Sequence, residues 1–493
     1  MRENISLKAF VLLSILIAIV SVGITRYVYT SGSEIAIEKH SFIKCASYII
    51  EKDGSTIKAF NGTTGELYTS GLDAVTVIQS AIGATPDGGT VVVRESNSVL
   101  ELSNVLQINK NVNFYCYAKL KACDFFPTWR VIEISASDIM VYLYELDGNK
   151  AGNSEVLYNG VDFKSCQNVE ANIHTKNMGY GDVGFKGQPD RYNKNVRLHL
   201  QSEDSGGGRD LNFVVHLSPC NDNIVISGHV QNVTTKTDGG QVLYVSGTLG
   251  VVTLKDFKAE NIDATKPVID VRTNGTLFID NVELKNLSPF GMMIYPDAEV
   301  YAENLRMLEV NTSSYGITNR GLFIGSNIKV EGGVCAVETR MGSDHLMLNG
   351  FELSGSTSYH ILVRSDSKGH HTVVNGKIIG AYGVRDNCTR KSIFENLDLS
   401  GVTATRTYGA VVRDSVGWVE KNCGVVSITG SYTSVVVTHG LSKTPIAVLV
   451  TPEQDGQGKV WVSAIGSTSF SINFDNQPGT STWYFNWYAE YQP

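Results

Sequence analysis

Charged residues are scarce in this chain. Asp, Glu, Lys and Arg make up 18% of the 493 residues, and the formal net charge is −8 at pH 7. A mild negative balance on this length argues against non-specific binding to nucleic acid. The eight cysteines are scattered without a C-x-x-C pair, so we expect no metal site and leave buried thiols or a few disulfides as alternatives. A glycine-rich phosphate loop and a nucleophile elbow are also missing.

Strand-forming and turn-forming residues are what the chain has in abundance. Apolar residues make up 42% of it, and 48 residues are glycine. The excess of Gly, Asn, Thr and Val over Ala, Leu, Glu and Lys indicates strands and turns rather than helices. The length is enough for two or three domains.

The N-terminus carries a targeting signal. A run of 17 uncharged residues lies between Lys8 and Arg26, behind a short head that includes Arg2. This is just long enough to cross a bilayer, and it also fits a long signal-peptide core. Because no clean small-x-small cleavage site follows, we expect residues 1–30 to form an uncleaved membrane anchor, with a cleaved signal peptide as the alternative. The rest of the chain is then exposed on the cell surface or secreted.

Five of the seven N-x-S/T triplets in the chain are taken to agree with export and predict a glycoprotein. They begin at Asn61, Asn232, Asn274, Asn311 and Asn387.

A short phrase recurs along the chain, in which an Asn is flanked by runs with alternating apolar residues, as in "FIDNVELKN" and "FENLDLSG". The marker falls at six positions with steps of 23, 23, 22, 26 and 21 residues: Asn281, Asn304, Asn327, Asn349, Asn375 and Asn396. Weaker copies extend the series toward the N-terminus through Asp256, Gly228 and Asn172. A fixed period in this range is typical of a solenoid.

Each period holds three runs of three to five residues, which are too short for helices and suit strands. Three short strands per rung, with apolar residues pointing inward on alternate positions, predict a right-handed parallel β-helix. Its rungs stack about 4.8 Å apart. Asn tolerates the left-handed dihedrals of a sharp corner better than most residues. Stacked Asn amides can donate to one another, which satisfies polar groups that the bend would leave inside.

This ladder of Asn residues resembles that of the pectate-lyase-like β-helix superfamily, and the upstream segment resembles the superfamily's capping helix. In "LDAVTVIQSAIGA" (72–84) one helical face carries Leu72, Val75, Ile78, Gln79 and Ile82. "PDGG" then ends the helix. Such a helix plugs the open end of the solenoid, where an uncovered rung would be an exposed sheet edge. The resemblance implies an all-β chain with a capping module at 31–95 and a parallel β-helix at 96–420.

After Cys423 the sequence repeat ends. Residues 421–493 read as five or six alternating strands, which predicts a small antiparallel β-sandwich. "VTHGLSKTP" and "FNWYAEY" resemble the C-terminal modules of H-type lectins and of viral fibre tips. In the last strand one face holds Trp483, Phe485 and Trp487, and the other holds Tyr484, Asn486 and Tyr488. One face belongs to the core. Aromatic rings on the other could stack on sugars or pack against a neighbouring subunit, and our candidates are Trp461, Tyr484 and Tyr488.

A second recurring residue is arginine at the end of the first strand of each rung. The series reads Arg320, Arg340, Arg364, Arg385 and Arg413, with Arg272 as a candidate first member. If the registers hold, the guanidinium groups stack at rung spacing and repel by about 1 kcal/mol or more per neighbouring pair. Acidic residues stand near three of them: Asp366, Asp386 and Asp414. Two interpretations stay open. The arginines and aspartates form solvated Arg–Asp ladders, or the four arginines from Arg340 onward and the three aspartates line a groove for an anionic glycan, whose carboxylates the arginines bind.

A second candidate patch lies between residues 179 and 216, where the repeat steps are longer and longer loops are expected. Its candidate catalytic residues are Asp182, Lys186, Asp204 and Asp210. Two carboxylates at a suitable separation would serve a glycosidase. The alternative is that these residues are ordinary polar residues of turns and loops, with no catalytic role. The polygalacturonase-type signature is missing, apart from Gly228-His229.

These observations predict a protein that recognises extracellular polysaccharide through a β-helix shaft and a lectin-like tip, with a homotrimer as one assembly. One alternative is a polysaccharide lyase or glycosidase of the same fold. A lyase would need a base beside the α-proton, and Ca²⁺ or Arg to stabilise the enediolate. The clustered Asp ligands and the signature around a catalytic Arg are missing here, so we expect no cofactor. The other alternative is a purely structural shaft.

Overall fold

The computed structural model describes residues 45–491, except for positions 97, 154–158, 207–212, 235–239, 247–249, 273, 289, 342–344, 368, 389–391, 409–410 and 417–420. The expected membrane anchor at residues 1–30 lies outside the described residues and stays a prediction. Among the helices that the structure does describe, none has the length and apolarity to cross a membrane.

The N-terminal module consists of a three-stranded antiparallel meander followed by one helix and three short strands. In chain order these elements are β1 (Tyr48–Asp53), β2 (Thr56–Asn61), β3 (Leu67–Gly71), α2 (Ala74–Ala84), β4 (Thr90–Val93), β5 (Leu100–Leu102) and β6 (Leu106–Ile108). Strand β4 pairs in parallel with β7, and β6 pairs in parallel with β8, so the module leads directly into the solenoid.

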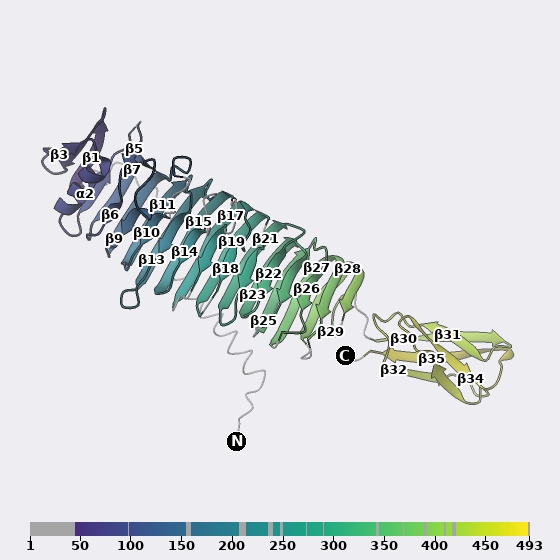
Figure 1. Cartoon of the computed structure of the whole chain (residues 1–493). Helices are drawn as coiled ribbons and strands as arrows, with labels where there is room; N and C mark the ends of the chain where they lie inside the picture. Colours follow the sequence, from purple (N-terminus) through teal and green to yellow (C-terminus); the bar gives the residue numbers. More distant parts are fainter. Residues whose placement is uncertain are drawn as a thin grey trace, which may run out of the picture. The chain divides into compact units, whose positions relative to one another are not determined.

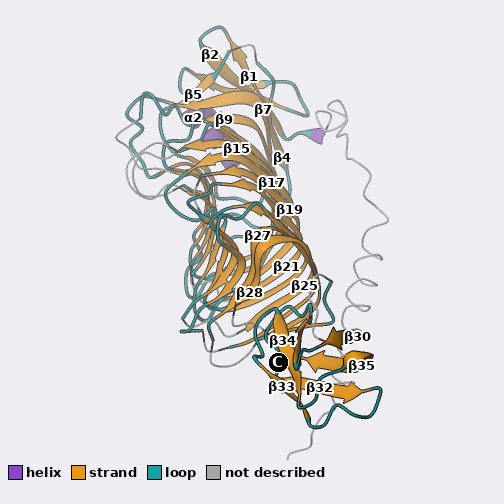
Figure 2. Cartoon of the chain, turned by 90° about the vertical axis from the view of Figure 1, so that its right-hand side faces the viewer, coloured by secondary structure: helices purple, strands orange, loops and turns teal. Residues whose placement is uncertain are grey.

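The solenoid alternates long and short strands, each paired in parallel with its equivalent on the next rung (Figure 1). The long strands are β7 (Asn113–Ala122), β9 (Ile139–Asp147), β11 (Gln167–Lys176), β13 (Asn193–Glu203), β15 (Asn221–Thr234), β17 (Val251–Asp263), β19 (Thr276–Leu287), β21 (Glu299–Val310), β23 (Leu322–Gly332), β25 (His345–Ser354), β27 (His370–Asp386) and β28 (Ile393–Tyr408). The short strands are β8 (Arg130–Ile134), β10 (Asn159–Phe163), β12 (Gly181–Phe185), β14 (Phe213–Leu217), β16 (Gln241–Val245), β18 (Ile269–Val271), β20 (Met292–Ile294), β22 (Tyr315–Asn319), β24 (Cys335–Thr339) and β26 (Tyr359–Val363). The short strand β29 (Val411–Arg413) pairs with the start of β28. Figure 2 shows the strands following one another as a single stack. The predicted parallel β-helix is confirmed.

From β17 onward, each long strand bends where a residue adopts a left-handed conformation, and it thereby supplies two of the three predicted strands of its rung. In β19, Ile279 and Val282 are buried, whereas Asp280 and Asn281 between them face outward. The Asn adds one outward position to the two-residue alternation, and this lets apolar residues on both sides of the bend reach the core.

The marker residues stack at this bend, as expected. The φ angle is 55° at Asn281, 55° at Asn304, 52° at Asn327, 56° at Asn375 and 53° at Asn396. Hydrogen bonds between the side-chain amides join neighbouring rungs; for example, Asn396 Nδ2 donates to Asn375 Oδ1 at 2.6 Å. The ladder faces solvent, however. The expectation that it serves polar groups inside the solenoid is wrong, because the extra residue of the bend is an outward one.

Three members of the predicted series depart from it. Gly228 pairs in register with Phe257, one residue after the bend at Asp256. Asn349 does not occupy the left-handed position, which Gly350 takes with a φ of 71°. Asn172 lies in a straight part of β11, where it pairs with Tyr142 and His199. The N-terminal extension of the ladder therefore holds at Asp256, which has a φ of 48°, and fails at Gly228 and Asn172.

Two further ladders occupy other corners, and the sequence pattern did not reveal them. In one, each Asn amide donates a hydrogen bond to the equivalent residue of the preceding rung, at 2.7, 2.9 and 2.7 Å along the series Asp138, Asn168, Asn195 and Asn223. In the other, the corresponding hydrogen bonds measure 3.1, 3.1 and 2.9 Å along the series Asp204, Asn232, Asn261 and Asn286. Every corner needs a residue that tolerates positive φ, so the same residue type recurs at each.

The helix α2 lies beside β5 at the N-terminal end of the stack (Figure 2). Val75, Ile78 and Ile82 are buried in the solenoid core. Gln79 bonds twice with the outer edge of β6: its Nε2 donates to the Gln107 carbonyl at 2.9 Å, and its Oε1 accepts from the Gln107 N–H at 3.0 Å. The predicted capping role is confirmed, except that Leu72 precedes the helix and is 75% exposed.

The C-terminal region forms two antiparallel three-stranded sheets. One is ordered β30 (Lys421–Gly430), β35 (Gly479–Glu490), β32 (Ala447–Pro452), and the other β31 (Ser434–Thr438), β34 (Ser469–Phe474), β33 (Val460–Ser463). Trp483, Phe485 and Trp487 from the first sheet share one core with Phe470 and Phe474 from the second. The predicted sandwich and its buried aromatic face are confirmed.

None of the eight cysteines, all of which lie in the described part, forms a disulfide. Burial raises the pKa of the Cys116 and Cys166 thiols to about 12, so both stay protonated.

Candidate functional site

The outer face of the short-strand sheet gathers charged and aromatic side chains. Alternation along β24 places Val337 in the core and Glu338 on the outer side, and Arg340 follows directly after the strand. The same pattern repeats on neighbouring rungs, so equivalent outer side chains line up along the solenoid.

Four arginines occupy one equivalent position on this face, and we call them the arginine row: Arg272, Arg320, Arg340 and Arg364. Each donates its backbone N–H to a carbonyl oxygen of the preceding rung. The pairs are Arg272 to Val245 at 2.9 Å, Arg320 to Ile294 at 2.8 Å, Arg340 to Asn319 at 2.9 Å and Arg364 to Thr339 at 3.3 Å. Tyr295 takes the equivalent place between Arg272 and Arg320, bonded to Val271 at 2.9 Å. The predicted alignment is confirmed for these four arginines.

The structure places the last two arginines of the predicted series elsewhere. Arg385 pairs with Leu362, two residues before Arg364, so it lies one outward position earlier in its rung. Arg413 pairs with Glu395 in the long-strand sheet. The prediction that all five arginines share one column is therefore wrong, because β27 continues from the long-strand sheet into the short-strand sheet and β29 returns to the former.

The predicted acidic partners are also different from those observed. Asp386 is buried and accepts the backbone N–H groups of Cys388 and Ser392 at 2.8 and 3.0 Å. Asp366 and Asp414 are exposed, and among the described residues neither lies within ion-pair distance of an arginine, although the charge of Asp366 helps to raise the pKa of Arg364.

The actual counter-charges come from the residue two positions before an arginine, which alternation puts on the same face. Glu338 is fully buried and pairs with Arg340 Nε at 2.6 Å and with Arg364. Asp270 is fully buried and pairs with Arg272 Nη2 at 3.1 Å, while Gln241 Nε2 donates to it at 3.2 Å. Burial raises the pKa of Asp270, although Arg272 and Gln241 act in the opposite direction.

The charge balance of the arginine row is positive. Two carboxylates stand against four guanidinium groups, and within the described part of the chain no carboxylate lies in ion-pair range of Arg320. Arg320 donates instead to the Met341 carbonyl at 3.3 Å. The row can therefore accept further negative charge.

Tyrosine rings lie against guanidinium groups of the arginine row, and these tyrosines were missed from the sequence. The Arg272 guanidinium lies 5.3 Å from the Tyr244 ring centroid and 5.1 Å from that of Tyr295. Arg340 lies 5.2 Å from Tyr315 in the same way. A signal was present: in "YGITNR" and "YHILVR" a Tyr stands five residues before the Arg. Cation–π contacts hold the guanidinium planes against the sheet and leave their edges for ligands.

No family model and no curated protein matches the chain, but solved structures do. The A-module of a mannuronan C-5 epimerase from Azotobacter vinelandii is 13% identical, over 70% of this chain and 95% of that one, with a TM-score of 0.46. A tailspike protein of the E. coli bacteriophage HK620 is 11% identical over 87% and 92%, with a TM-score of 0.48. An endo-xylogalacturonan hydrolase of Aspergillus tubingensis is 15% identical over 74% and 94%, with a TM-score of 0.30. The strand pairing of the chain itself shows a parallel β-helix. Likeness at this level concerns the fold and does not say which residues act.

The three candidates of the second predicted patch that the structure describes do not come together. Asp182 points into the solenoid, where its Oδ2 accepts the hydroxyl groups of Thr175, Ser202 and Ser205 at 2.6, 2.6 and 2.8 Å. Burial raises its pKa to about 6. Lys186 lies on the outer face and pairs with the buried Asp162 at 3.0 Å, and Asp204 belongs to a corner ladder. Asp210 lies outside the described residues.

The three aromatic candidates of the C-terminal sandwich do not meet either. Tyr484 is 40% exposed on the outer side of the sheet that contains β35, and the hydroxyl of Tyr488 on the same side donates to Glu490 at 2.8 Å. Trp461, 42% exposed, lies on the other sheet. Since the two sheets share one core, Trp461 faces the opposite side of the sandwich.

The residues that the structure describes contain no group of three or more His, Cys, Asp or Glu side chains suited to hold a metal ion.

Proposed function

We propose that this protein binds an acidic polysaccharide along the arginine row. The observation that carries the proposal is the excess of guanidinium groups over carboxylates at one repeated position. Rungs stack about 4.8 Å apart. Arg320, Arg340 and Arg364 lie on three consecutive rungs and Arg272 lies two rungs before Arg320, so the row offers donors at multiples of this spacing to an extended chain that bears carboxylates. Planar guanidinium groups bind carboxylates in a bidentate manner, and the tyrosine rings add surfaces on which sugars can stack.

Binding without cleavage is the form of the proposal that the site supports best. A glycosidase requires two carboxyl groups that reach the substrate, and the carboxylates Glu338 and Asp270 are fully buried under their arginines. The expected export, cell-surface anchoring, glycosylation and homotrimer remain parts of the proposal that rest on the sequence. A lectin-like role of the C-terminal sandwich is likewise part of it, with Tyr484 and Tyr488 on one face and Trp461 on another.

The test is retention of the purified protein on acidic glycans, such as polygalacturonate and alginate, compared with neutral ones such as dextran. The double variant Arg340→Ala/Arg364→Ala should weaken binding by roughly 100-fold or more, because it removes two charge-assisted contacts of about 1.5–3 kcal/mol each and about 1.4 kcal/mol corresponds to a tenfold change. Arg197→Ala is the matched control, since Arg197 is an exposed arginine on the long-strand sheet.

The same incubations are followed for unsaturated uronate absorbance and for new reducing ends. Retention without either product supports a binding protein. Release of unsaturated sugars would assign a lyase instead, and failure to retain any acidic glycan would favour a structural shaft.

A further inference from the structure

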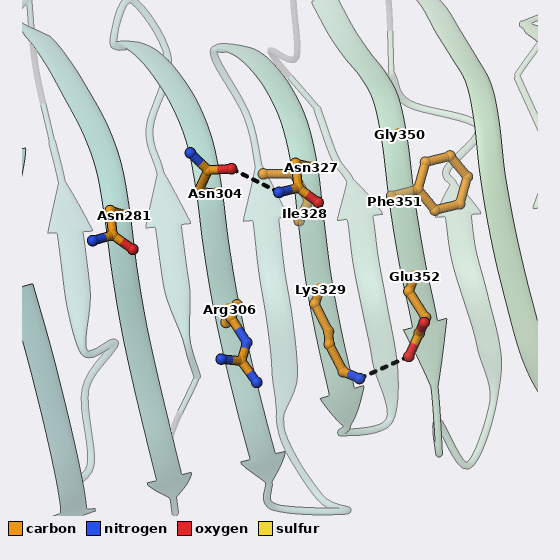
Figure 3. Close-up of a pocket in the computed structure, with 9 residues that line it drawn as sticks. All are labelled: Asn281, Asn304, Arg306, Asn327, Ile328, Lys329, Gly350, Phe351 and Glu352. Carbon is orange, nitrogen blue, oxygen red and sulfur yellow. Dashed lines mark hydrogen bonds and ion pairs between the residues drawn. The ribbon is translucent and has the colours of Figure 1, made fainter. Parts of the chain in front are cut away.

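A concave site lies on the long-strand sheet, at the bend that carries the Asn ladder. It is a hollow of about 570 Å³, lined by residues of four consecutive rungs: Asn281, Asn304, Arg306, Asn327, Ile328, Lys329, Gly350, Phe351 and Glu352. Figure 3 shows amides along its upper part and the ends of Arg306, Lys329 and Glu352 along its lower part. Its size falls in the range of small-molecule sites.

The Asn ladder is interrupted in this hollow. Asn281 donates to Asp256 at 2.7 Å, Asn327 donates to Asn304 at 2.6 Å, and Asn375 donates to Asn349 at 2.8 Å. Among the described residues, however, no hydrogen bond joins the side-chain amides of Asn281 and Asn304 (Figure 3). The amides of Asn327 and Asn349 are not joined either. The ladders at the other two corners run through four rungs without a break.

The second interruption has a visible cause. Asn349 pairs in register with Ser326, one position before the bend, and Gly350 stands at the bend itself. A side chain is therefore missing beside Asn327, and a Cβ atom at Gly350 would meet nothing closer than 3.7 Å. The missing side chain is part of what makes the hollow.

The interruptions leave exposed hydrogen-bonding groups without partners in the described chain. Asn304 Nδ2 is a donor of this kind, and Asn281 Oδ1 and Asn327 Oδ1 are acceptors. Sugar hydroxyl groups both donate and accept, so a set of mixed donors and acceptors at rung spacing suits them.

The charges around the hollow are balanced, in contrast to the arginine row. Lys329 Nζ pairs with Glu352 Oε1 at 2.7 Å, and Arg306 Nη1 pairs with Glu283 Oε2 at 2.9 Å. The Arg306 side chain is nevertheless 54% exposed and has further N–H donors. A balanced set of charges does not select for an anion.

We infer that this hollow binds an uncharged sugar residue through its hydroxyl groups. The ring would lie against the bend between the Asn281 and Asn327 amides, with Arg306 and the Lys329–Glu352 pair on its other side. Phe351 is only 6% exposed, so recognition depends on hydrogen bonds rather than on ring stacking. The inference is independent of the acidic ligand proposed for the arginine row.

Ligand-observed NMR tests the inference with the full chain and four probes: glucose, galactose, mannose and N-acetylglucosamine. We expect at least one to bind with an affinity that added salt leaves unchanged. Gly350→Asn should weaken it about tenfold, because the new side chain occupies the gap beside Asn327, and Asn tolerates the φ of 71°. Its melting temperature should stay at or above that of the unaltered protein.

A second pair of variants removes the dependence on one substitution. Arg306→Gln should weaken sugar binding, whereas Glu283→Gln breaks the same ion pair from outside the hollow and should leave binding intact. Lack of binding by all four sugars would overturn the inference, as would equal binding by Gly350→Asn and Arg306→Gln. Sugar binding that is lost only in Arg340→Ala/Arg364→Ala would belong to the arginine row and would also overturn it.

Discussion

At the scale of single residues, Glu338 joins the stability of the solenoid to its proposed ligand site. It is a fully buried carboxylate between two partly exposed arginines. Glu338→Gln should lower the free energy of unfolding by about 1–2 kcal/mol, since two partly exposed guanidinium groups lose a charged hydrogen-bond partner. The same variant should bind acidic glycan more tightly than the unaltered protein.

Urea unfolding and glycan titration of the same preparation check both effects. Glu331→Gln is the control because Glu331 is exposed, and it should change stability by less than about 0.5 kcal/mol. A Glu338→Gln protein with unaltered stability would show that Arg340 and Arg364 do not need this carboxylate.

Asp182 should give the solenoid a characteristic dependence on pH. Burial raises its pKa from 3.8 to about 6 in the folded chain, so the folded state holds the proton more tightly than the unfolded state. Stability from this residue is then full below about pH 4 and is lost as the pH rises toward 6. Asp182→Asn keeps an acceptor for the three hydroxyl groups and carries no charge.

The Asn variant should therefore be more stable than the unaltered protein at pH 7, by up to about 3 kcal/mol, and equally stable near pH 4. Urea unfolding at the two pH values measures the difference. Identical pH profiles for the two proteins would mean that Asp182 is not desolvated.

At the scale of elements, the capping helix protects the first solenoid edge through a single side chain. Gln79 satisfies both the N–H and the carbonyl of Gln107 in β6. Gln79→Met preserves the length of the side chain but leaves both backbone groups unpaired, which should cost about 1–3 kcal/mol. An open strand edge also favours association.

Thermal melts and size-exclusion chromatography detect the two effects. Ser80→Ala is the matched control on the same helix, because the Ser80 hydroxyl bonds only to the Thr76 carbonyl within α2. Similar behaviour of the two variants would show that the edge of β6 is protected by packing alone.

At the scale of the whole molecule, the described chain has two large separate hydrophobic cores. One fills the solenoid and the other fills the C-terminal sandwich. We expect the predicted domain of residues 421–493 to fold by itself, since its core draws on strands of this segment only. Calorimetry of the full chain should then show two transitions, one of which matches the isolated fragment. A fragment without cooperative unfolding would place the boundary elsewhere.

The residues that repeat along the chain determined the architecture. Asn281 and its successors fix the bends, because few residue types tolerate positive φ, and the apolar alternation between them leaves only a stacked parallel coil. Helix α2 could likewise be read from its periodicity, and the C-terminal sandwich from its alternation. These are local requirements, and the sequence therefore displays them directly.

Only the tertiary structure decided which side chains meet. Arg385 and Arg413 follow the repeat in sequence, but register moves one of them by two residues and the other to a different sheet. Glu338 and Asp270 become the counter-charges of the arginine row because alternation turns them outward beside arginines. The hollow at Gly350 depends on a one-residue displacement of Asn349. Such contacts are set by register between rungs more than 20 residues apart in the chain, and no single repeat contains that information.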